Sequence, residues 1–136
     1  MSNIFLTHKD AYYKNIKPVV ADYAYRGKRY HIDFALAIGF CDKNINLCDF
    51  IQIKRKTDKV IPLENNLCCI IFDCVDAKRV ESATQNLKKQ MNTKCNTEEF
   101  FIEVVTCSEY ENDLKMFNYL FDDLEHFLLN KSYKTL

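Results

Sequence analysis

The most continuous apolar run of the chain is Phe34-Ala35-Leu36-Ala37-Ile38-Gly39-Phe40. No residue in it carries a polar side chain, so neither face of a strand built from it would suit contact with water. Such a run is typical of a strand that is buried on both faces. We therefore predict a central strand at 34–40, with the segments 60–72 and 100–107 pairing on its two sides.

Residues 60–72 are predicted to form a hairpin. Two strand-like runs, 60–63 and 67–72, are separated by Glu64-Asn65-Asn66. Asparagine tolerates the left-handed conformation that tight hairpin turns use, so we place the turn there. Pro62 has no backbone N–H to donate, which assigns its strand to an edge of the sheet or to the hairpin entry.

Apolar residues at helical spacing predict four helices. Thr7 is a candidate N-cap for the first, Pro18 predicts a bend within it, and Gly27 is a natural C-terminal stop. The predicted ranges are 8–26, a short helix within 42–54, 77–91 and 111–129. The element order is then αβαββαβα, an α+β fold in which helices pack on a mainly antiparallel sheet.

The chain has 136 residues, of which 48% are hydrophobic and 28% charged, and this predicts a single folded domain over residues 1–136. Its formal net charge is zero, so we expect neither nucleic acid nor a membrane surface as a partner. The charge is unevenly distributed, because residues 1–60 carry 11 Lys/Arg and 6 Asp/Glu, whereas residues 61–136 carry 8 and 13. The first part of the chain could therefore attract a phosphate-bearing ligand.

Seven cysteines occur, at positions 41, 48, 68, 69, 74, 95 and 107, without a Cys-x-x-Cys pair. Most lie in strand-like runs, so we interpret them as reduced, buried side chains and expect no metal and no cofactor. No export signal precedes the first helix, and no apolar run is long enough to span a bilayer. We expect a cytoplasmic protein whose sensor or output domains, if any, are separate chains.

The helix predicted at 111–129 carries a wide apolar stripe. Its members are Leu114, Phe117, Leu120, Phe121, Leu124, Phe127 and Leu128. Most of such a stripe belongs to the core of a domain. Its width and the two aromatic residues Tyr119 and Phe127 leave room for a homodimer or partner surface.

Arg55-Lys56-Thr57-Asp58 precedes the hairpin, with five residues between Asp58 and Glu64. This spacing resembles the GGDEF domain of diguanylate cyclases, in which an Arg-x-x-Asp site lies at the same distance before a Gly-Gly-Asp-Glu-Phe hairpin. The resemblance covers about residues 6–128 and implies a nucleotide-cyclase-like fold with a ferredoxin-like core. Its other matches are Leu6-Thr7, the strand and its end at 35–42, and Asp76 before the helix 77–91.

The groups that the family uses for catalysis are replaced in this chain. By the resemblance, Phe40 and Leu67 occupy the positions where the family holds metal ions with an Asp and a Glu, and neither side chain can bind a hard cation. Glu64 and Asn65 replace the two glycines that let the backbone approach the nucleotide. Only 12 residues separate Asp42 from the Arg-x-x-Asp motif, too few for the helix with which the family contacts guanine. We therefore expect the chain not to be an enzyme.

Arg55 and Asp58 are the candidate ligand-binding residues, and the resemblance implies cyclic di-GMP as their ligand. Arginine matches the O6/N7 edge of guanine with two hydrogen bonds, and a carboxylate accepts from guanine N–H groups. Lys54, Lys56 and Lys59 would supply positive charge for the phosphodiesters. The alternative interpretation is a surface ion pair between Arg55 and Asp58, with solvated lysines around it.

Three functions remain open at this point. The leading hypothesis is a catalytically inactive GGDEF-like regulatory or protein-interaction module with an unknown protein partner, which the resemblance places in bacterial signalling. The second is a cyclic di-GMP receptor that uses Arg55 and Asp58. The third is a ferredoxin-like small domain unrelated to GGDEF proteins. Residual nucleotide chemistry would require Asp42 and Asp73 to lie near the hairpin as non-standard metal ligands.

Overall fold

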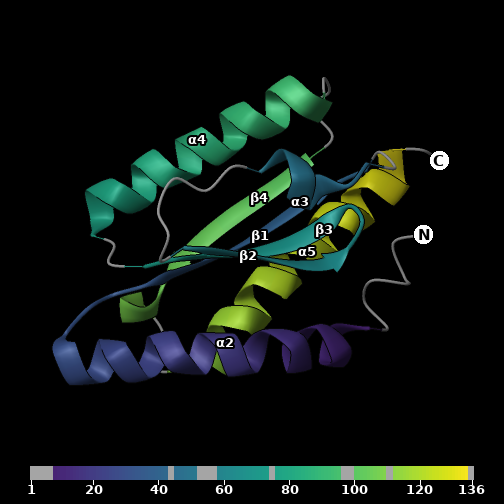
Figure 1. The fold of residues 1–136 in the computed structure, drawn as a ribbon. Coiled ribbons are helices and arrows are strands. Elements are labelled where there is room, and N and C mark those ends of the chain that lie inside the picture. The colour runs from purple at the N-terminus through teal and green to yellow at the C-terminus, as the bar shows by residue number, and fades with distance from the viewer. Residues whose placement is uncertain are drawn as a thin grey trace.

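A computed structural model of the chain describes residues 8–42, 45–51, 58–73, 76–95, 100–109 and 112–134. Figure 1 shows the arrangement of its helices and strands. The elements, in chain order, are α2 (Lys9–Tyr30), β1 (Ala35–Cys41), α3 (Leu47–Phe50), β2 (Lys59–Glu64), β3 (Leu67–Phe72), α4 (Ala77–Cys95), β4 (Phe100–Thr106), the 3₁₀ turn η1 (Cys107–Glu109) and α5 (Asp113–Lys134). The predicted order αβαββαβα is confirmed.

The four strands form one antiparallel sheet in the order β2-β3-β1-β4. β1 pairs with β3 on one side, where Phe40 lies opposite Leu67, and with β4 on the other side, where Ile38 lies opposite Glu103. Every residue of β1 is buried. The prediction of a central strand at 34–40 between the hairpin and the segment 100–107 is therefore confirmed, although β1 itself begins and ends one residue later.

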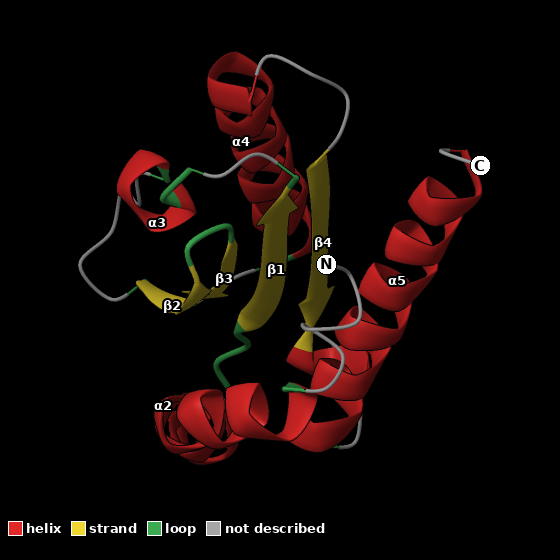
Figure 2. Ribbon diagram, turned by 90° about the vertical axis from the view of Figure 1, so that its right-hand side faces the viewer, coloured by secondary structure: helices red, strands yellow, loops and turns green. Residues whose placement is uncertain are grey.

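Helices cover both faces of this sheet, with α2 and α5 on one face and α3 and α4 on the other (Figure 2). Successive strand residues point to opposite faces, so β1 contributes to two apolar clusters. Leu36 and Phe40 pack under α2 and α5, whereas Ala35 and Ala37 pack under α3 and α4. Each large apolar side chain buried in this way stabilises the fold by about 1.5–3 kcal/mol.

The hairpin forms where the sequence predicted it, but its turn is built differently. β2 is an outer strand of the sheet and Pro62 is exposed on it, which confirms the edge position. Among the residues that the structure describes, positive φ occurs outside glycine at His31 alone, so the prediction of a left-handed Asn65-Asn66 turn is wrong. The carbonyls of Asn65 and Asn66 accept hydrogen bonds from other parts of the chain, and these contacts rather than the preference of asparagine fix the turn.

α2 is longer than predicted, and its end has a different construction. Pro18 lies inside the helix without ending it, and the helix continues past Gly27 to Tyr30. His31 is the left-handed residue (φ 55°) that ends the helix, and its N–H donates to the Gly27 carbonyl. A Cβ at position 27 would lie 2.7 Å from the carbonyl oxygen of Ile32. Glycine is therefore needed here for a close backbone approach and not for a left-handed conformation.

The remaining helices follow the apolar periodicity of the sequence. α4 contains the predicted range 77–91 and buries its apolar residues Leu87 and Met91, and α3 is a single turn within the predicted range 42–54. In α5 most of the predicted stripe is buried, but Leu114 is exposed. None of the described helices is long and apolar enough to cross a membrane.

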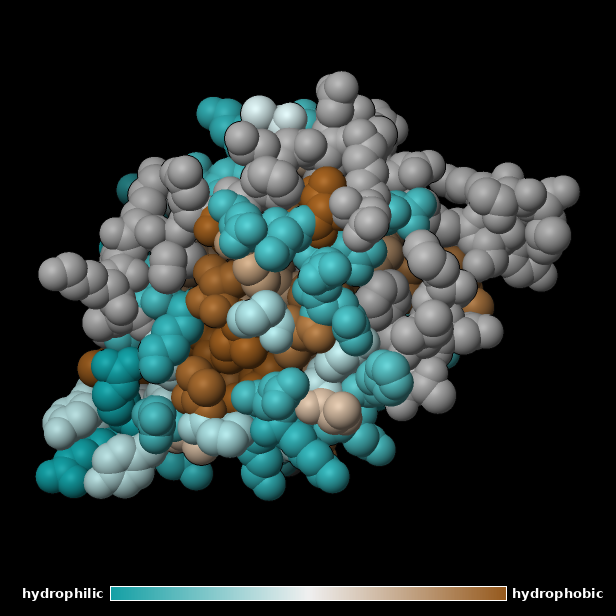
Figure 3. All heavy atoms as spheres, turned by 45° about the vertical axis from the view of Figure 1, so that its right-hand side comes forward, coloured by the Kyte–Doolittle hydropathy of each residue, from teal (hydrophilic) through white to brown (hydrophobic). Residues whose placement is uncertain are grey.

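Phe127 and Tyr119, the two aromatic residues of α5 considered for a partner surface, differ in their surroundings. The ring of Phe127 packs against the sheet, with centroids 6.3 Å from Phe40 and 5.6 Å from Phe101. Tyr119 is exposed. Figure 3 shows that one face of the molecule gathers apolar side chains at its middle, with hydrophilic side chains around them.

Candidate functional site

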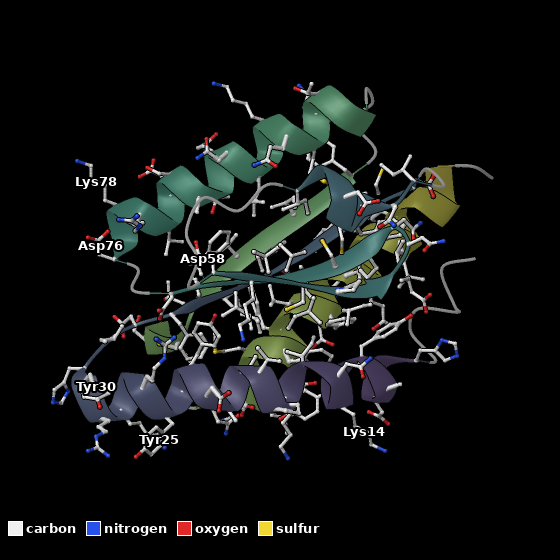
Figure 4. The ribbon with its side chains drawn as sticks, viewed as in Figure 1. Lys14, Tyr25, Tyr30, Asp58, Asp76 and Lys78 are labelled. Carbon is white, nitrogen blue, oxygen red and sulfur yellow. The ribbon has the colours of Figure 1, made fainter. Side chains whose placement is uncertain are left out.

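Asp58 lies immediately before β2, at the opposite end of the hairpin from its turn; Arg55 lies outside the described residues. Figure 4 shows Asp58 at the same end of the molecule as Asp76 and Tyr30. Its side chain is buried, with 6% of the residue exposed, and Oδ1 accepts a hydrogen bond of 2.8 Å from the N–H of Asp73. Asp58 is therefore not a surface residue, and an ion pair with Arg55 stays untested because Arg55 lies outside the described residues.

Asp73, the residue after β3, is buried beside Asp58 and carries the second carboxylate of this site. Its Oδ2 lies 3.0 Å from a terminal guanidinium nitrogen of Arg26 in α2. A buried carboxylate without a partner would destabilise the fold strongly, and the arginine offsets most of that effect. The Arg26–Asp73 ion pair thus links the last turns of α2 to the end of the hairpin opposite its turn.

Tyr23 completes this group of side chains. The guanidinium of Arg26 lies 4.8 Å from the centroid of the Tyr23 ring, a cation–π contact. Burial, followed by the nearby carboxylate of Asp73, raises the pKa of the Tyr23 hydroxyl. We call Tyr23, Arg26, Asp58 and Asp73 the hairpin-end network. The Arg26–Asp73 ion pair, the Arg26–Tyr23 contact and the hydrogen bond between Asp73 and Asp58 join the end of α2 to the open end of the hairpin.

Phe40 and Leu67 lie at the other end of the hairpin. They are direct partners in the pairing of β1 with β3, and their residues are 2% and 0% exposed. Both belong to the apolar cluster under α2 and α5. The two positions that the resemblance assigns to metal-binding carboxylates are thus occupied by adjacent core side chains.

The turn between β2 and β3 makes its polar contacts inside the molecule. The N–H of Leu47 donates to the Asn65 carbonyl at 2.7 Å, and the N–H of Cys41 donates to the Asn66 carbonyl at 3.0 Å. The carboxylate of Glu64 accepts a 2.9 Å hydrogen bond from the Tyr12 hydroxyl. These bonds attach the turn to α3, to the end of β1 and to α2. In the family this segment approaches the nucleotide. In this chain its polar groups form hydrogen bonds with other parts of the protein.

Asp42 and Asp73, the carboxylates considered as non-standard metal ligands, are not brought together. Asp42 follows β1 and Asp73 follows β3, and because these strands are antiparallel their ends point in opposite directions. By the register of β1 and β3, Asp73 is level with position 34, so eight residue steps of extended chain, about 26 Å, separate it from Asp42 along the strand direction. Within the described part of the chain, no group of three His, Cys, Asp or Glu side chains could hold a metal ion.

The last turns of α2 expose aromatic and basic side chains. Tyr25 and Tyr30 are 61% and 58% exposed, the largest values among the large hydrophobic residues that the structure describes (Figure 4). Arg29 joins them, because its Nη1 donates a 2.9 Å hydrogen bond to the Tyr25 hydroxyl and its guanidinium lies 5.6 Å from the Tyr30 ring. Lys28 is exposed beside them. We call Tyr25, Lys28, Arg29 and Tyr30 the α2 surface patch.

Neither the hairpin-end network nor the α2 surface patch was predicted from the sequence. Arg26-Gly27-Lys28-Arg29 has the composition of a helix end, and charge at a helix end needs no further explanation. The Asp73 partner of Arg26 is remote in the chain. The position of Asp73 could have indicated this pair. Asp73 directly follows a fully apolar strand, where a carboxylate lies near the core and requires a partner.

Comparison with known proteins identifies the fold. No family model and no curated protein matches the chain. Among solved structures, it is similar to the crystal structure of a DGC (diguanylate cyclase) protein from Thermotoga maritima, with a TM-score of 0.63 and 10% sequence identity. The match covers 79% of this chain and 88% of that chain. An identity this low supports a conclusion about the fold alone, and the predicted α+β, GGDEF-like fold is confirmed.

Proposed function

We propose that this chain is a catalytically inactive GGDEF-like regulatory module that acts by binding another protein. The observation that supports it is the pairing of Phe40 with Leu67 inside the core. A diguanylate cyclase joins two GTP molecules by attack of a ribose hydroxyl on an α-phosphate, which requires metal ions to activate the hydroxyl and neutralise phosphate charge. Two adjacent apolar side chains supply no ligand for such ions.

A protein partner fits the α2 surface patch. Tyrosine and arginine are the residue types that most often dominate the energy of protein–protein binding. Arg29 is held between Tyr25 and Tyr30, so less side-chain freedom is lost when a partner binds. Lys28 is exposed beside Arg29, and these two positive charges favour an acidic surface on the partner.

Incubation with GTP tests the absence of catalysis. The purified protein is incubated with GTP and Mg²⁺ or Mn²⁺, and cyclic di-GMP is measured by mass spectrometry against a blank preparation and an active diguanylate cyclase. We expect no product above the blank. Product formed by this protein, in proportion to its concentration, would show that the core positions do not prevent catalysis.

The partner is sought with a photo-crosslinking amino acid at position 25 and then studied as a purified protein. Arg29→Glu should weaken its binding at least about tenfold, because reversal of a central charge typically changes the binding energy by more than 1.4 kcal/mol. Lys78→Glu, the same charge reversal at an exposed position of α4, is the matched control and should change affinity much less. Equal effects of the two variants would exclude the α2 surface patch as the contact.

The cyclic di-GMP receptor hypothesis is tested separately by calorimetry. Because Asp58 is buried and bonded to the Asp73 N–H, binding through its carboxylate would require a local rearrangement. A binding heat with cyclic di-GMP, accompanied by a change in near-UV circular dichroism, would favour the receptor. No heat at high micromolar nucleotide would leave protein contacts as the proposed mode of action.

A further inference from the structure

Two cysteines from different elements contact each other on the face of the sheet that carries α3 and α4. Cys48 lies in α3 and Cys68 lies in β3, and their thiols share a hydrogen bond. Both are free thiols. Cys68 is fully buried, whereas Cys48 is partly exposed.

The fold fixes this juxtaposition independently of the thiols. The hydrogen bond from the Leu47 N–H to the Asn65 carbonyl ties the start of α3 to the turn just before β3. The Sγ of Cys68 lies over Gly39 of the neighbouring strand, where an added Cβ would be only 3.3 Å from the sulfur and 3.6 Å from a methyl carbon of Leu47. The absence of a side chain at Gly39 thus leaves room for the sulfur under the first turn of α3.

The two thiols differ in reactivity in a complementary way. The hydrogen bond from Cys68 lowers the pKa of the Cys48 thiol, so the partly exposed Cys48 ionises more readily than Cys68. The same bond and burial raise the pKa of Cys68, which keeps its proton. The thiolate is the form of cysteine that peroxides oxidise, and its neighbour is a second thiol within reach.

We propose that Cys48 and Cys68 form a reversible disulfide on exposure to hydrogen peroxide. The Cys48 thiolate attacks one peroxide oxygen, the O–O bond breaks, and the leaving hydroxide takes a proton to become water. The resulting sulfenic acid is attacked by the Cys68 sulfur, which forms the S–S bond and releases the hydroxyl group with the Cys68 proton as a second water. Two thiols are oxidised by two electrons, and one peroxide is reduced to two waters.

The bond would have a defined structural effect. It would join α3 to β3 and close a covalent loop over residues 48–68, which contains both Arg55 and Asp58. The freedom of that segment would then depend on the oxidation state of two cysteines. This inference does not rest on the proposed function, because it requires only the two thiols and an oxidant.

Peptide mapping tests the proposal. The folded protein is treated with hydrogen peroxide, the remaining thiols are blocked with N-ethylmaleimide in denaturant, and the digest is analysed by mass spectrometry before and after reduction. We expect a cross-linked peptide pair containing Cys48 and Cys68, lighter by two hydrogens than the separate peptides and abolished by dithiothreitol. Cys69→Ser is the matched control, since Cys69 is the next residue of β3 but packs on the opposite face of the sheet, and it should retain the cross-link.

Two variants decide the assignment. Cys68→Ser should lose the cross-link and accumulate a Cys48 sulfenic acid that dimedone traps. Cys48→Ser, which changes a partly exposed residue and should fold, should leave Cys68 fully reduced at the same peroxide dose. The proposal would be overturned by a cross-link that persists in Cys68→Ser, by wild-type Cys48 that ends as sulfinic acid without a cross-link, or by Cys68 that oxidises in the absence of Cys48.

Discussion

Glu103 provides the sharpest test of the energetics of this fold. It lies in the middle of the outer strand β4, opposite Ile38, with its side chain half-buried. Burial, and then the hydrogen bond and negative charge of Asp123 in α5, raise the pKa of Glu103 from 4.5 to about 7. Tyr119 and Lys88 act in the opposite direction but more weakly. Replacement of Glu103 by glutamine keeps the shape of the protonated acid and removes its titration.

The effect on stability has a definite sign and pH range. Below pH 4.5 the Glu103 carboxyl is protonated in both the folded and the unfolded chain, and its full contribution to stability is present. As the pH rises from 4.5 to about 7, the unfolded chain releases the proton while the folded chain keeps it, so the free energy of unfolding falls. The full difference corresponds to about 3 kcal/mol. Solvent screening at a half-exposed carboxyl reduces this to about 1–2 kcal/mol.

Urea unfolding at several pH values measures this difference. We expect Glu103→Gln to raise the free energy of unfolding by about 1–2 kcal/mol at pH 8 and to leave it unchanged at pH 4. Glu81→Gln, the same substitution at an exposed position of α4, should have little effect at either pH. A gain that is equal at pH 4 and pH 8, or a loss at pH 8, would refute the reasoning about Glu103.

Three further substitutions have expected outcomes. Arg26→Ala should lower the free energy of unfolding by about 2 kcal/mol, since it leaves the buried Asp73 without its cation; a change below that of exposed Arg29→Ala would argue against the ion pair. Gly27→Ala should destabilise by about 1–3 kcal/mol, because its Cβ would meet a backbone oxygen at 2.7 Å, whereas a gain in stability would show that the backbone relaxes. If calorimetry detects cyclic di-GMP binding, Arg55→Ala should weaken it by about 1–3 kcal/mol and Arg55→Lys nearly as much. Undiminished binding by Arg55→Ala would remove that residue from the site.

The sequence was most informative where structure follows from local periodicity. The run at 34–40 predicted a central strand because a strand apolar at every position has to be covered on both faces. Pro62 predicted the outer strand because it lacks a backbone donor, and apolar residues at helical spacing predicted the helix at 77–91. These features depend on a few neighbouring residues, so they could be recognised without the rest of the chain.

The predictions failed where a distant residue determines the local conformation. Gly27 was expected to end the first helix, but the backbone at Ile32 requires a small residue there and His31 ends the helix instead. The Asn65-Asn66 turn was expected to be left-handed, but bonds from other elements to its carbonyls determine its shape. Likewise, the pairing of Arg26 with Asp73 joins elements whose contact follows only from the complete topology.

The positions of Glu103 and Pro62 also have a consequence for the behaviour of many copies at high concentration. β4 and β2 are the two outer strands of the sheet, and an outer strand can recruit a strand from another molecule through its free backbone groups. A strand added beside β4 would bury the Glu103 carboxyl further, and one added beside β2 would meet a missing donor at Pro62. Both edges of the sheet therefore oppose the addition of strands from other molecules. The Glu103→Gln variant should gain folding stability but lose part of its resistance to aggregation.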